Sequence, residues 1–108
     1  MPTVSTHVLD VAAGRPAHGV EVTLSPVPAG SDDDATMART DAEGRIADGL
    51  GGPLAAGLWR LTFALGSYFG EGAGCLATLD VTLVLDEDRH YHVPVLATPN
   101  SATTYLGA

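Results

Sequence analysis

The stretch Leu58-Trp59-Arg60-Leu61-Thr62-Phe63-Ala64-Leu65 decides the fold class of this chain. Its apolar side chains recur at every second position, and its polar side chains, Arg60 and Thr62, fall between them. Successive side chains of a β-strand point to opposite faces. The stretch therefore predicts a strand that has one face in a core, made by Trp59, Leu61, Phe63 and Leu65.

The same alternation continues on both sides of residues 58–65. It predicts two more half-buried strands, at 20–24 and 79–85, and shorter β-rich runs at 4–9, 91–96 and 103–106, with a weaker run at 35–40. Turn-forming residues separate these runs, at 13–16, 28–31, 41–44 and 50–53. Gly70, Gly72 and Gly74 limit any helix within residues 66–75 to one turn. Six or seven short strands in 108 residues indicate an all-β, two-sheet sandwich in one domain, 1–108.

The charge of the chain excludes several classes of partner. Five arginines, no lysine and thirteen acidic residues give a formal net charge of −8, which repels the backbone of nucleic acid and an anionic membrane surface. No apolar run approaches the roughly 20 residues that span a bilayer, and the first residues show no signal peptide. The single cysteine, Cys75, excludes a disulfide framework and suits a reducing compartment. We therefore expect a cytoplasmic protein.

Histidines on outward strand faces are the first candidates for chemistry. His90 and His92 share one face of their strand, and the apolar residues around them take the other face. His7 shares a face with Ser5 in the 4–9 strand. Imidazole titrates near neutral pH and serves as acid, base or metal ligand. If the two strands lie in one sheet, three imidazoles converge on one surface.

Other interpretations of these residues stay open. Each histidine also fits a surface or hydrogen-bonded structural role. A His-x-His pair with a third histidine matches a three-ligand zinc site, although no cysteine or carboxylate lies at ligand spacing beside the pair. The run Asp32-Asp33-Asp34 lacks the spacing of a calcium loop and indicates a solvated loop tip. Neither a serine nor Cys75 lies in an activating context, so activation of water by imidazole is the simplest chemistry available.

Arg45 is the leading candidate for binding an electron-rich ligand. It follows the turn Thr40-Asp41-Ala42-Glu43-Gly44 and opens a new segment. This placement aims a planar guanidinium with five donors at a carbonyl or an anion. The alternative is an ion pair between Arg45 and the acidic residues that precede it.

Three motifs together resemble the transthyretin-like family. They are Thr6-His7-Val8-Leu9-Asp10 followed by Gly14-Arg15-Pro16, Thr40-Asp41-Ala42-Glu43-Gly44-Arg45, and His90-Tyr91-His92-Val93-Pro94. Residues 60–63 and 66–69 add to the resemblance, which spans essentially the whole chain in the family's order. The enzymatic branch of this family consists of 5-hydroxyisourate hydrolases.

The resemblance implies an antiparallel two-sheet sandwich of seven to eight strands and a homotetramer with active sites at an interface between dimers. It also implies hydrolysis of a ring amide of 5-hydroxyisourate in purine (urate) degradation, without metal or cofactor. The family's catalytic residues match His7, Arg45 and His92, which strand phase and charge also single out. Tyr105 and His90 are expected to bind substrate. The choice between His7 and His92 as general base stays open.

Two segments depart from the family's pattern. The branch carries an arginine and a serine where this chain has Leu106 and Ala108, and residues 72–76 replace a usual aromatic-proline entry by a glycine-rich loop. The altered tail keeps a second interpretation open, a non-enzymatic transthyretin-like module that binds a small aromatic ligand in a channel between subunits. Self-association is expected in either case, because apolar side chains lie on outward strand faces. These side chains are Leu9, Val84 and Leu96.

Overall fold

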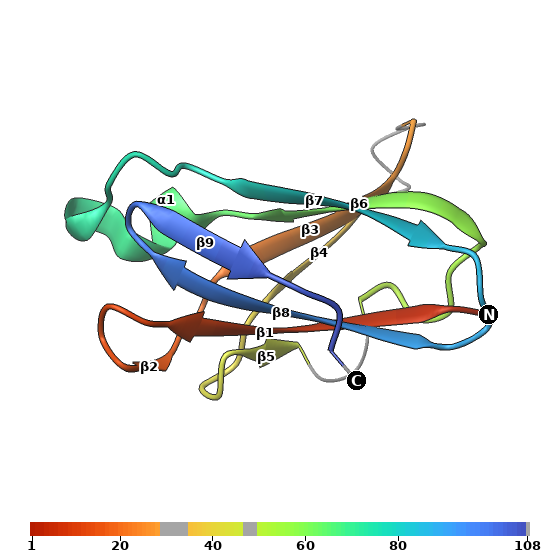
Figure 1. The fold of residues 1–108 in the computed structure, drawn as a ribbon, viewed down its shortest axis with the longest axis horizontal. Helices are drawn as coiled ribbons and strands as arrows, with labels where there is room; N and C mark the ends of the chain where they lie inside the picture. Colours follow the sequence, from red (N-terminus) through yellow and green to blue (C-terminus); the bar gives the residue numbers. More distant parts are fainter. Residues whose placement is uncertain (29–34, 47–49, 108) are drawn as a thin grey trace.

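The computed structural model describes residues 1–28, 35–46 and 50–107, which form two β-sheets packed face to face (Figure 1). The first sheet has the strand order β2-β1-β8-β9, with β5 also paired to β1, and the second has the order β4-β3-β6-β7. The strands are β1 (Thr3–Asp10), β2 (Arg15–Pro16), β3 (Glu21–Pro26), β4 (Thr36–Arg39), β5 (Arg45–Ile46), β6 (Gly57–Phe63), β7 (Leu79–Leu85), β8 (His90–Thr98) and β9 (Ser101–Thr104). Helix α1 (Leu65–Phe69) and the 3-10 helix η2 (Gly70–Gly72) follow β6.

These elements confirm the predicted all-β sandwich with one short helix. The run expected at 103–106 is shifted, because β9 ends at Thr104, and the turn expected at 13–16 contains the short edge strand β2. The turn at 28–31 lies partly, and the run Asp32-Asp33-Asp34 wholly, outside the described residues. No helix in the described part of the chain is long and apolar enough to cross a membrane.

Strands β1 and β8 pair in parallel, which corrects the expectation of a wholly antiparallel sandwich. Their register runs from Thr3 beside His90 to Asp10 beside Ala97. Parallel neighbours need a long crossover, because a tight turn joins only antiparallel strands. Here the crossover includes all four strands of the second sheet. Alternation of apolar residues specifies the faces of a strand but not the direction of its neighbour, so the sequence pattern did not reveal this pairing.

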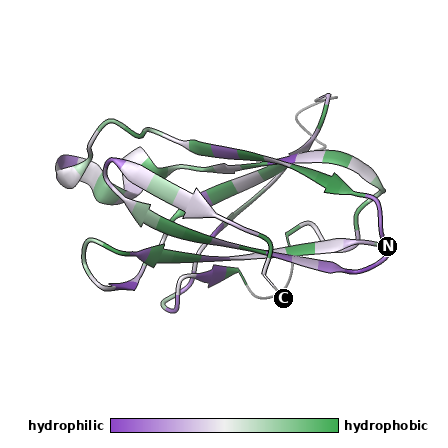
Figure 2. Cartoon of the chain, viewed as in Figure 1, coloured by the Kyte–Doolittle hydropathy of each residue, from purple (hydrophilic) through white to green (hydrophobic). Residues whose placement is uncertain are grey.

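The core lies between the two sheets, and the alternation of polar and apolar residues along the strands is visible in Figure 2. The strand predicted at 58–65 ends earlier, because β6 ends at Phe63 and Leu65 begins helix α1. Leu61, Phe63 and Leu65 are buried all the same, and Trp59 is half-buried against the core. The first sheet contributes Val4, Val8, Tyr91, Val93 and Val95. The outward direction predicted for the histidines of β1 and β8 follows directly, since they occupy the alternate positions.

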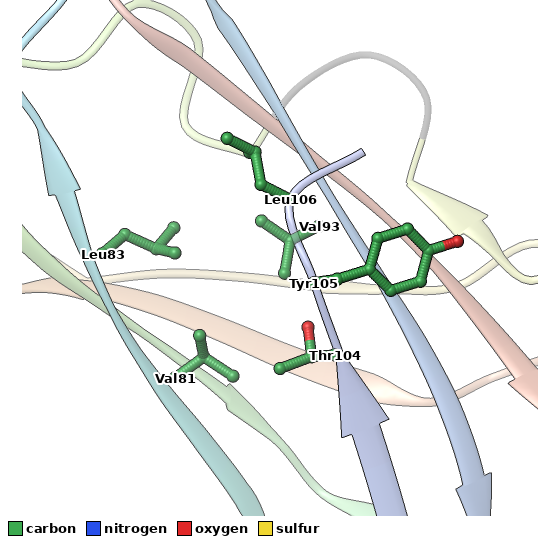
Figure 3. Close-up of a pocket in the computed structure, with 6 residues that line it drawn as sticks. All are labelled: Val81, Leu83, Val93, Thr104, Tyr105 and Leu106. Carbon is green, nitrogen blue, oxygen red and sulfur yellow. The ribbon is translucent and has the colours of Figure 1, made fainter. Parts of the chain in front are cut away.

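The two sheets separate slightly where the edge strands β7 and β9 face each other. An apolar cleft of about 170 Å³ lies there, lined by Val81, Leu83, Val93, Thr104, Tyr105 and Leu106. In Figure 3, Val81 and Leu83 point across the cleft toward Val93 and Leu106, whereas the Tyr105 ring turns away from them. The predicted core face of β7 is therefore only half-buried along this edge.

Two buried polar residues of the first motif make structural hydrogen bonds. Thr6 Oγ1 donates a hydrogen bond to the carbonyl oxygen of Val93 at 2.6 Å, across the β1–β8 pair. The Asp10 carboxylate accepts from the backbone N–H of Ala13 at 2.9 Å and from the Tyr68 hydroxyl at 2.8 Å. A buried carboxylate needs such donors to offset the loss of hydration. Thr6 and Asp10 thus have structural roles within the motif that contains His7.

The acidic turn before Arg45 folds on its own backbone. One carboxylate oxygen of Asp41 accepts hydrogen bonds from the backbone N–H groups of Glu43 at 2.9 Å and Arg45 at 3.0 Å. These bonds hold the pKa of Asp41 below its ordinary value, and the Arg45 backbone bond has the largest effect. Gly44 has a φ of 78°, and a Cβ atom there would lie 2.3 Å from the carbonyl oxygen of Val8. Only glycine fits this position, where the turn places β5 against β1.

Candidate functional site

The outward face of the first sheet brings the predicted site residues together in adjacent rows. Pairing of β5 with β1 places Arg45 beside His7, and pairing of β1 with β8 places His7 beside Pro94. The β8–β9 register, continued past Thr104, places Tyr105 on the other side of Pro94. One row across the sheet therefore runs from Arg45 through His7 and Pro94 to Tyr105.

The next two rows contain the histidines of β8. Ser5 lies beside His92, and Gly107 forms a bridge with His92 on the other side. Thr3 lies beside His90. The three imidazoles thus occupy one surface, as predicted for strands that share a sheet.

Hydroxyl groups of β1 connect the two β8 imidazoles. Ser5 Oγ lies 2.7 Å from His90 Nε2 and 2.8 Å from His92 Nδ1. Thr3 Oγ1 lies 2.6 Å from the remaining nitrogen of His90, Nδ1. Both nitrogens of His90 are therefore engaged by hydroxyls, whereas Nε2 of His92 has no hydrogen-bond partner among the described residues. Nε2 is the atom of His92 that is available to a substrate or a water molecule.

His7 is oriented by the backbone of the acidic turn. Its Nε2 lies 2.9 Å from the carbonyl oxygen of Glu43. A carbonyl oxygen only accepts hydrogen bonds, so Nε2 of His7 is the donor. Neutral His7 then carries its proton on Nε2 and presents the lone pair of Nδ1. The turn that positions Arg45 therefore also selects the tautomer of its neighbour His7.

The electrostatic environment keeps His92 neutral. Burial lowers the pKa of His92 most, and electrostatic interaction with His7, His90 and Arg45 lowers it further. Burial and neighbouring positive charge both disfavour the imidazolium form. His92 consequently keeps a basic lone pair at neutral pH, as a general base requires.

Among the residues that the structure describes, the Arg45 guanidinium has no ion-pair partner, so it is available for a ligand. The alternative considered from the sequence was an ion pair with the acidic turn, but Asp41 binds backbone N–H groups there. In the described part of the chain, the arginines that form ion pairs are Arg39, with Glu21, and Arg89, with Glu87. Arg45 is thus positioned by its backbone, next to His7.

In the C-terminal segment 105–107, alternate residues lie on the face of the sheet that contains the histidines. Tyr105 is 56% exposed and lies on the outward face, whereas Leu106 on the inward side lines the apolar cleft. Gly107 returns to the outward face, where its backbone N–H donates to the carbonyl oxygen of His92 at 2.7 Å. The departure at Leu106 therefore changes the cleft rather than the histidine surface. Ala108 lies outside the described residues.

A metal ion was the other sequence-based reading of the histidines. Among the residues that the structure describes, no three histidine, cysteine or acidic side chains are grouped closely enough to hold a metal ion. Three of the four ring nitrogens of His90 and His92 contact hydroxyl groups instead. Independence from metal stays a prediction, and chelation tests it below.

Comparison with known proteins agrees with the fold and shows the family of this chain. The model of the HIUase/Transthyretin family matches residues 4–107. The chain belongs to this family. Among its relatives, the 5-hydroxyisourate hydrolase of Deinococcus radiodurans is 41% identical, over 99% of this chain and 97% of that protein. The 5-hydroxyisourate hydrolase of Caulobacter vibrioides is 38% identical over the full length of both. The solved structure of Klebsiella pneumoniae 5-hydroxyisourate hydrolase is 35% identical, with a TM-score of 0.84, over 100% of this chain and 94% of that chain.

The sequence analysis did not predict three parts of the site. The hydroxyls of Ser5 and Thr3 and the carbonyl of Glu43 each contact an imidazole. Ser5 and Thr3 share the outward face of β1 with His7 by simple alternation, which was the available signal. The Glu43 carbonyl had no signal, because its position depends on the folded turn.

The lowered pKa of His92 predicts how the specificity constant kcat/KM of this protein should depend on pH. A histidine base is active when neutral, so kcat/KM should fall as the pH drops through the pKa of His92. Because that pKa lies below the ordinary value, the midpoint should lie below about 6.5. Measuring kcat/KM between about pH 4 and pH 8 checks this. A flat profile, or a midpoint above the ordinary histidine value, would contradict the assignment.

The contact between Gly107 and His92 predicts that a methyl group there disturbs the site. A Cβ atom at Gly107 would lie 2.9 Å from Cδ2 of His92 and 3.3 Å from its carbonyl oxygen. Gly107→Ala should therefore lower kcat by about 10-fold to 100-fold, since small misplacements of a catalytic group have effects of this size. Steady-state kinetics and thermal unfolding are the measurements.

The matched control for this substitution is Gly72→Ala. A Cβ atom at Gly72 meets nothing within 4 Å. This variant should retain the wild-type rate and the wild-type Tm. Equal rates for Gly107→Ala and Gly72→Ala would show that the tail does not constrain His92.

Proposed function

We propose that this protein is a 5-hydroxyisourate hydrolase, an enzyme of purine (urate) degradation that cuts a ring amide of 5-hydroxyisourate. The observation that carries the proposal is the convergence of His7, Arg45 and His92 on one sheet face. Full-length relatives named 5-hydroxyisourate hydrolase support it. Fold alone does not fix function, so the geometry of the site carries the main weight.

In the proposed mechanism, His92 is the general base. Its Nε2 takes a proton from water, and the water oxygen attacks the carbonyl carbon of the ring amide. His92 is favoured over His7 because its pKa is lowered and its Nδ1 is held by Ser5. The Nδ1 lone pair of His7 accepts a hydrogen bond from the water or from the substrate. The carbon–nitrogen bond then breaks as the ring nitrogen receives a proton.

Arg45 stabilises the negative charge that develops on the attacked carbonyl oxygen. A guanidinium aimed at this oxygen supplies charge-assisted hydrogen bonds that strengthen in the transition state. Tyr105, at the end of the same row, offers a phenol hydroxyl to the substrate. The mechanism uses no metal or cofactor.

The rival reading is a non-enzymatic module that binds a small aromatic ligand between subunits. Such a module has no need for a neutral imidazole base beside a guanidinium. Addition of the protein to freshly generated 5-hydroxyisourate separates the two readings, because only the enzyme accelerates its decay over the spontaneous rate. If micromolar protein does not accelerate the decay of 5-hydroxyisourate, the hydrolase proposal is refuted and the binding module is favoured.

Removal of each catalytic side chain should abolish most of this activity. His7→Ala, Arg45→Ala and His92→Ala should each lower kcat/KM by about 100-fold or more while the fold stays intact, since general-base and electrostatic effects have this magnitude. The decay of 5-hydroxyisourate absorbance and the circular dichroism spectrum are the measurements.

A metal chelator should leave the wild-type rate of 5-hydroxyisourate hydrolysis unchanged. Loss of activity that zinc restores would contradict the mechanism.

Matched controls come from the same residue types elsewhere in the chain. His18 is exposed on a loop, and Arg39 pairs with Glu21 in the second sheet. His18→Ala and Arg39→Ala should retain the wild-type rate. A near wild-type rate in any of the three site variants would remove that residue from the mechanism.

We also propose that the functional form is a homotetramer. The histidine surface of one chain is an open sheet face, and apolar side chains on and near the sheet edges are strongly exposed. Val84 is 60% exposed and Leu106 is 50% exposed, more than an isolated chain favours. Sedimentation at micromolar concentration should therefore give a tetramer, and a monomer would contradict this proposal.

A cytoplasmic location is proposed on the chemistry of the single thiol. Cys75 is free and exposed. An unpaired exposed thiol suits a reducing compartment. Cell fractionation tests the location, and recovery of the protein outside the cytoplasm would contradict it.

A further inference from the structure

A continuous chain of four side chains leads from the protein surface to His92. The contacts join Thr3 Oγ1 to His90 Nδ1 at 2.6 Å, His90 Nε2 to Ser5 Oγ at 2.7 Å, and Ser5 Oγ to His92 Nδ1 at 2.8 Å. The outer link is exposed, whereas Ser5 is buried. The mechanism above uses only the inner end, the Nε2 atom of His92.

The proton count of this chain permits two complete arrangements. Each neutral imidazole and each hydroxyl has one proton to donate. In the first arrangement, His92 Nδ1 donates to Ser5, Ser5 donates to His90 Nε2, and His90 Nδ1 donates to Thr3, so Nε2 of His92 has a free lone pair. In the second arrangement every donor is reversed, and Nε2 of His92 carries a proton. All three contacts are satisfied in both arrangements.

We propose that Thr3, His90 and Ser5 form a proton relay between solvent and His92, a proposal that rests on the proposed hydrolase function. As Nε2 of His92 takes a proton from the attacking water, the Nδ1 proton passes to Ser5 and the Ser5 proton passes to His90 Nε2. The His90 Nδ1 proton passes to Thr3, whose own proton leaves to solvent. One proton enters the chain and one leaves, so His92 stays neutral.

The relay then runs in reverse to complete the reaction. When the carbon–nitrogen bond of the ring amide breaks, Nε2 of His92 donates its proton to the ring nitrogen. A solvent proton enters at Thr3, and the chain returns to its first arrangement. His90 and Ser5 act in this scheme as positioning residues for His92. For His90, this role replaces the substrate contact that the family resemblance implies, because both of its ring nitrogens contact hydroxyl groups.

The groups around His92 explain why a relay would be useful there. The groups that face His92 are His7 on β1, Arg45 on β5 and His90 on β8. Interaction with these three groups, together with burial, disfavours a full positive charge on His92. A relay that exports the proton avoids this charge. His7 has no such chain, because its Nε2 bonds to a backbone carbonyl.

Substitution of the buried link tests the relay in the enzyme. Ser5→Ala should lower kcat by about 10-fold to 100-fold and change KM by less than about threefold, since binding is not altered. In mixtures of H₂O and D₂O, the wild-type kcat should follow a curved proton inventory because several protons move together. The inventory of Ser5→Ala should be linear. A wild-type kcat and a curved inventory in Ser5→Ala would overturn the relay.

The outer link offers a matched pair of substitutions that spares the buried region. Thr3→Ser keeps the hydroxyl and should retain the wild-type kcat and the curved inventory. Thr3→Val keeps the shape and removes the hydroxyl, so it should lower kcat and alter the inventory. Equal kinetics for the two variants would exclude Thr3 from the relay, and thermal unfolding verifies that both are folded.

A measurement on the free protein separates failure of the relay from failure of the hydrolase. Imidazole ¹⁵N chemical shifts report the tautomers of His90 and His92 directly. In the wild type, protonation of one ring should switch the tautomer of the other, and in Ser5→Ala the two rings should titrate independently. Independent titration in the wild type would overturn the relay. Coupled titration in a protein that does not hydrolyse 5-hydroxyisourate would refute the hydrolase and support the relay.

Discussion

The parallel pairing of β1 with β8 is the constraint on which the site depends. Its register sets Ser5 beside His92 and Thr3 beside His90, and a slip by one residue would turn every outward side chain into the core. Burial of Val4, Val8 and Val95 on the inward faces makes such a slip costly. The hydrophobic core therefore fixes the distances within the histidine cluster without contacting it.

Strand alternation in the sequence was sufficient to predict which way the three histidines point but not which residues are their neighbours. Strand alternation correctly directed His7, His90 and His92 outward, because this information lies within each strand. Alternation contains no information about which strands are neighbours or about their direction, so the parallel pair and the role of Ser5 emerged only from the folded chain. Leu106 illustrates both sides: its departure from the family pattern was visible in the sequence, but its placement in the cleft was not.

The first two of the three motifs combine chemical and structural residues. In the first, His7 faces outward while Thr6 and Asp10 make buried hydrogen bonds. In the second, Asp41 folds the turn that presents Arg45 and the carbonyl oxygen bound by His7. A catalytic side chain is useful only when held in a narrow range of positions. The motifs are therefore longer than the few groups that would touch a substrate require, because the other residues hold those groups in position.

The glycine-rich segment 72–76 lies at the far end of the sandwich from the histidine cluster. It contacts the β8–β9 turn, where the backbone N–H of Cys75 donates to the side-chain oxygen of Asn100 at 2.8 Å. His7 lies beside Pro94 in the middle of β8, and Asn100 follows the end of that strand, so the second half of β8 separates this loop from the reacting groups. A change in the length of this loop is therefore expected to leave the arrangement of the reacting groups intact. The same loop is a natural insertion point for engineered peptides.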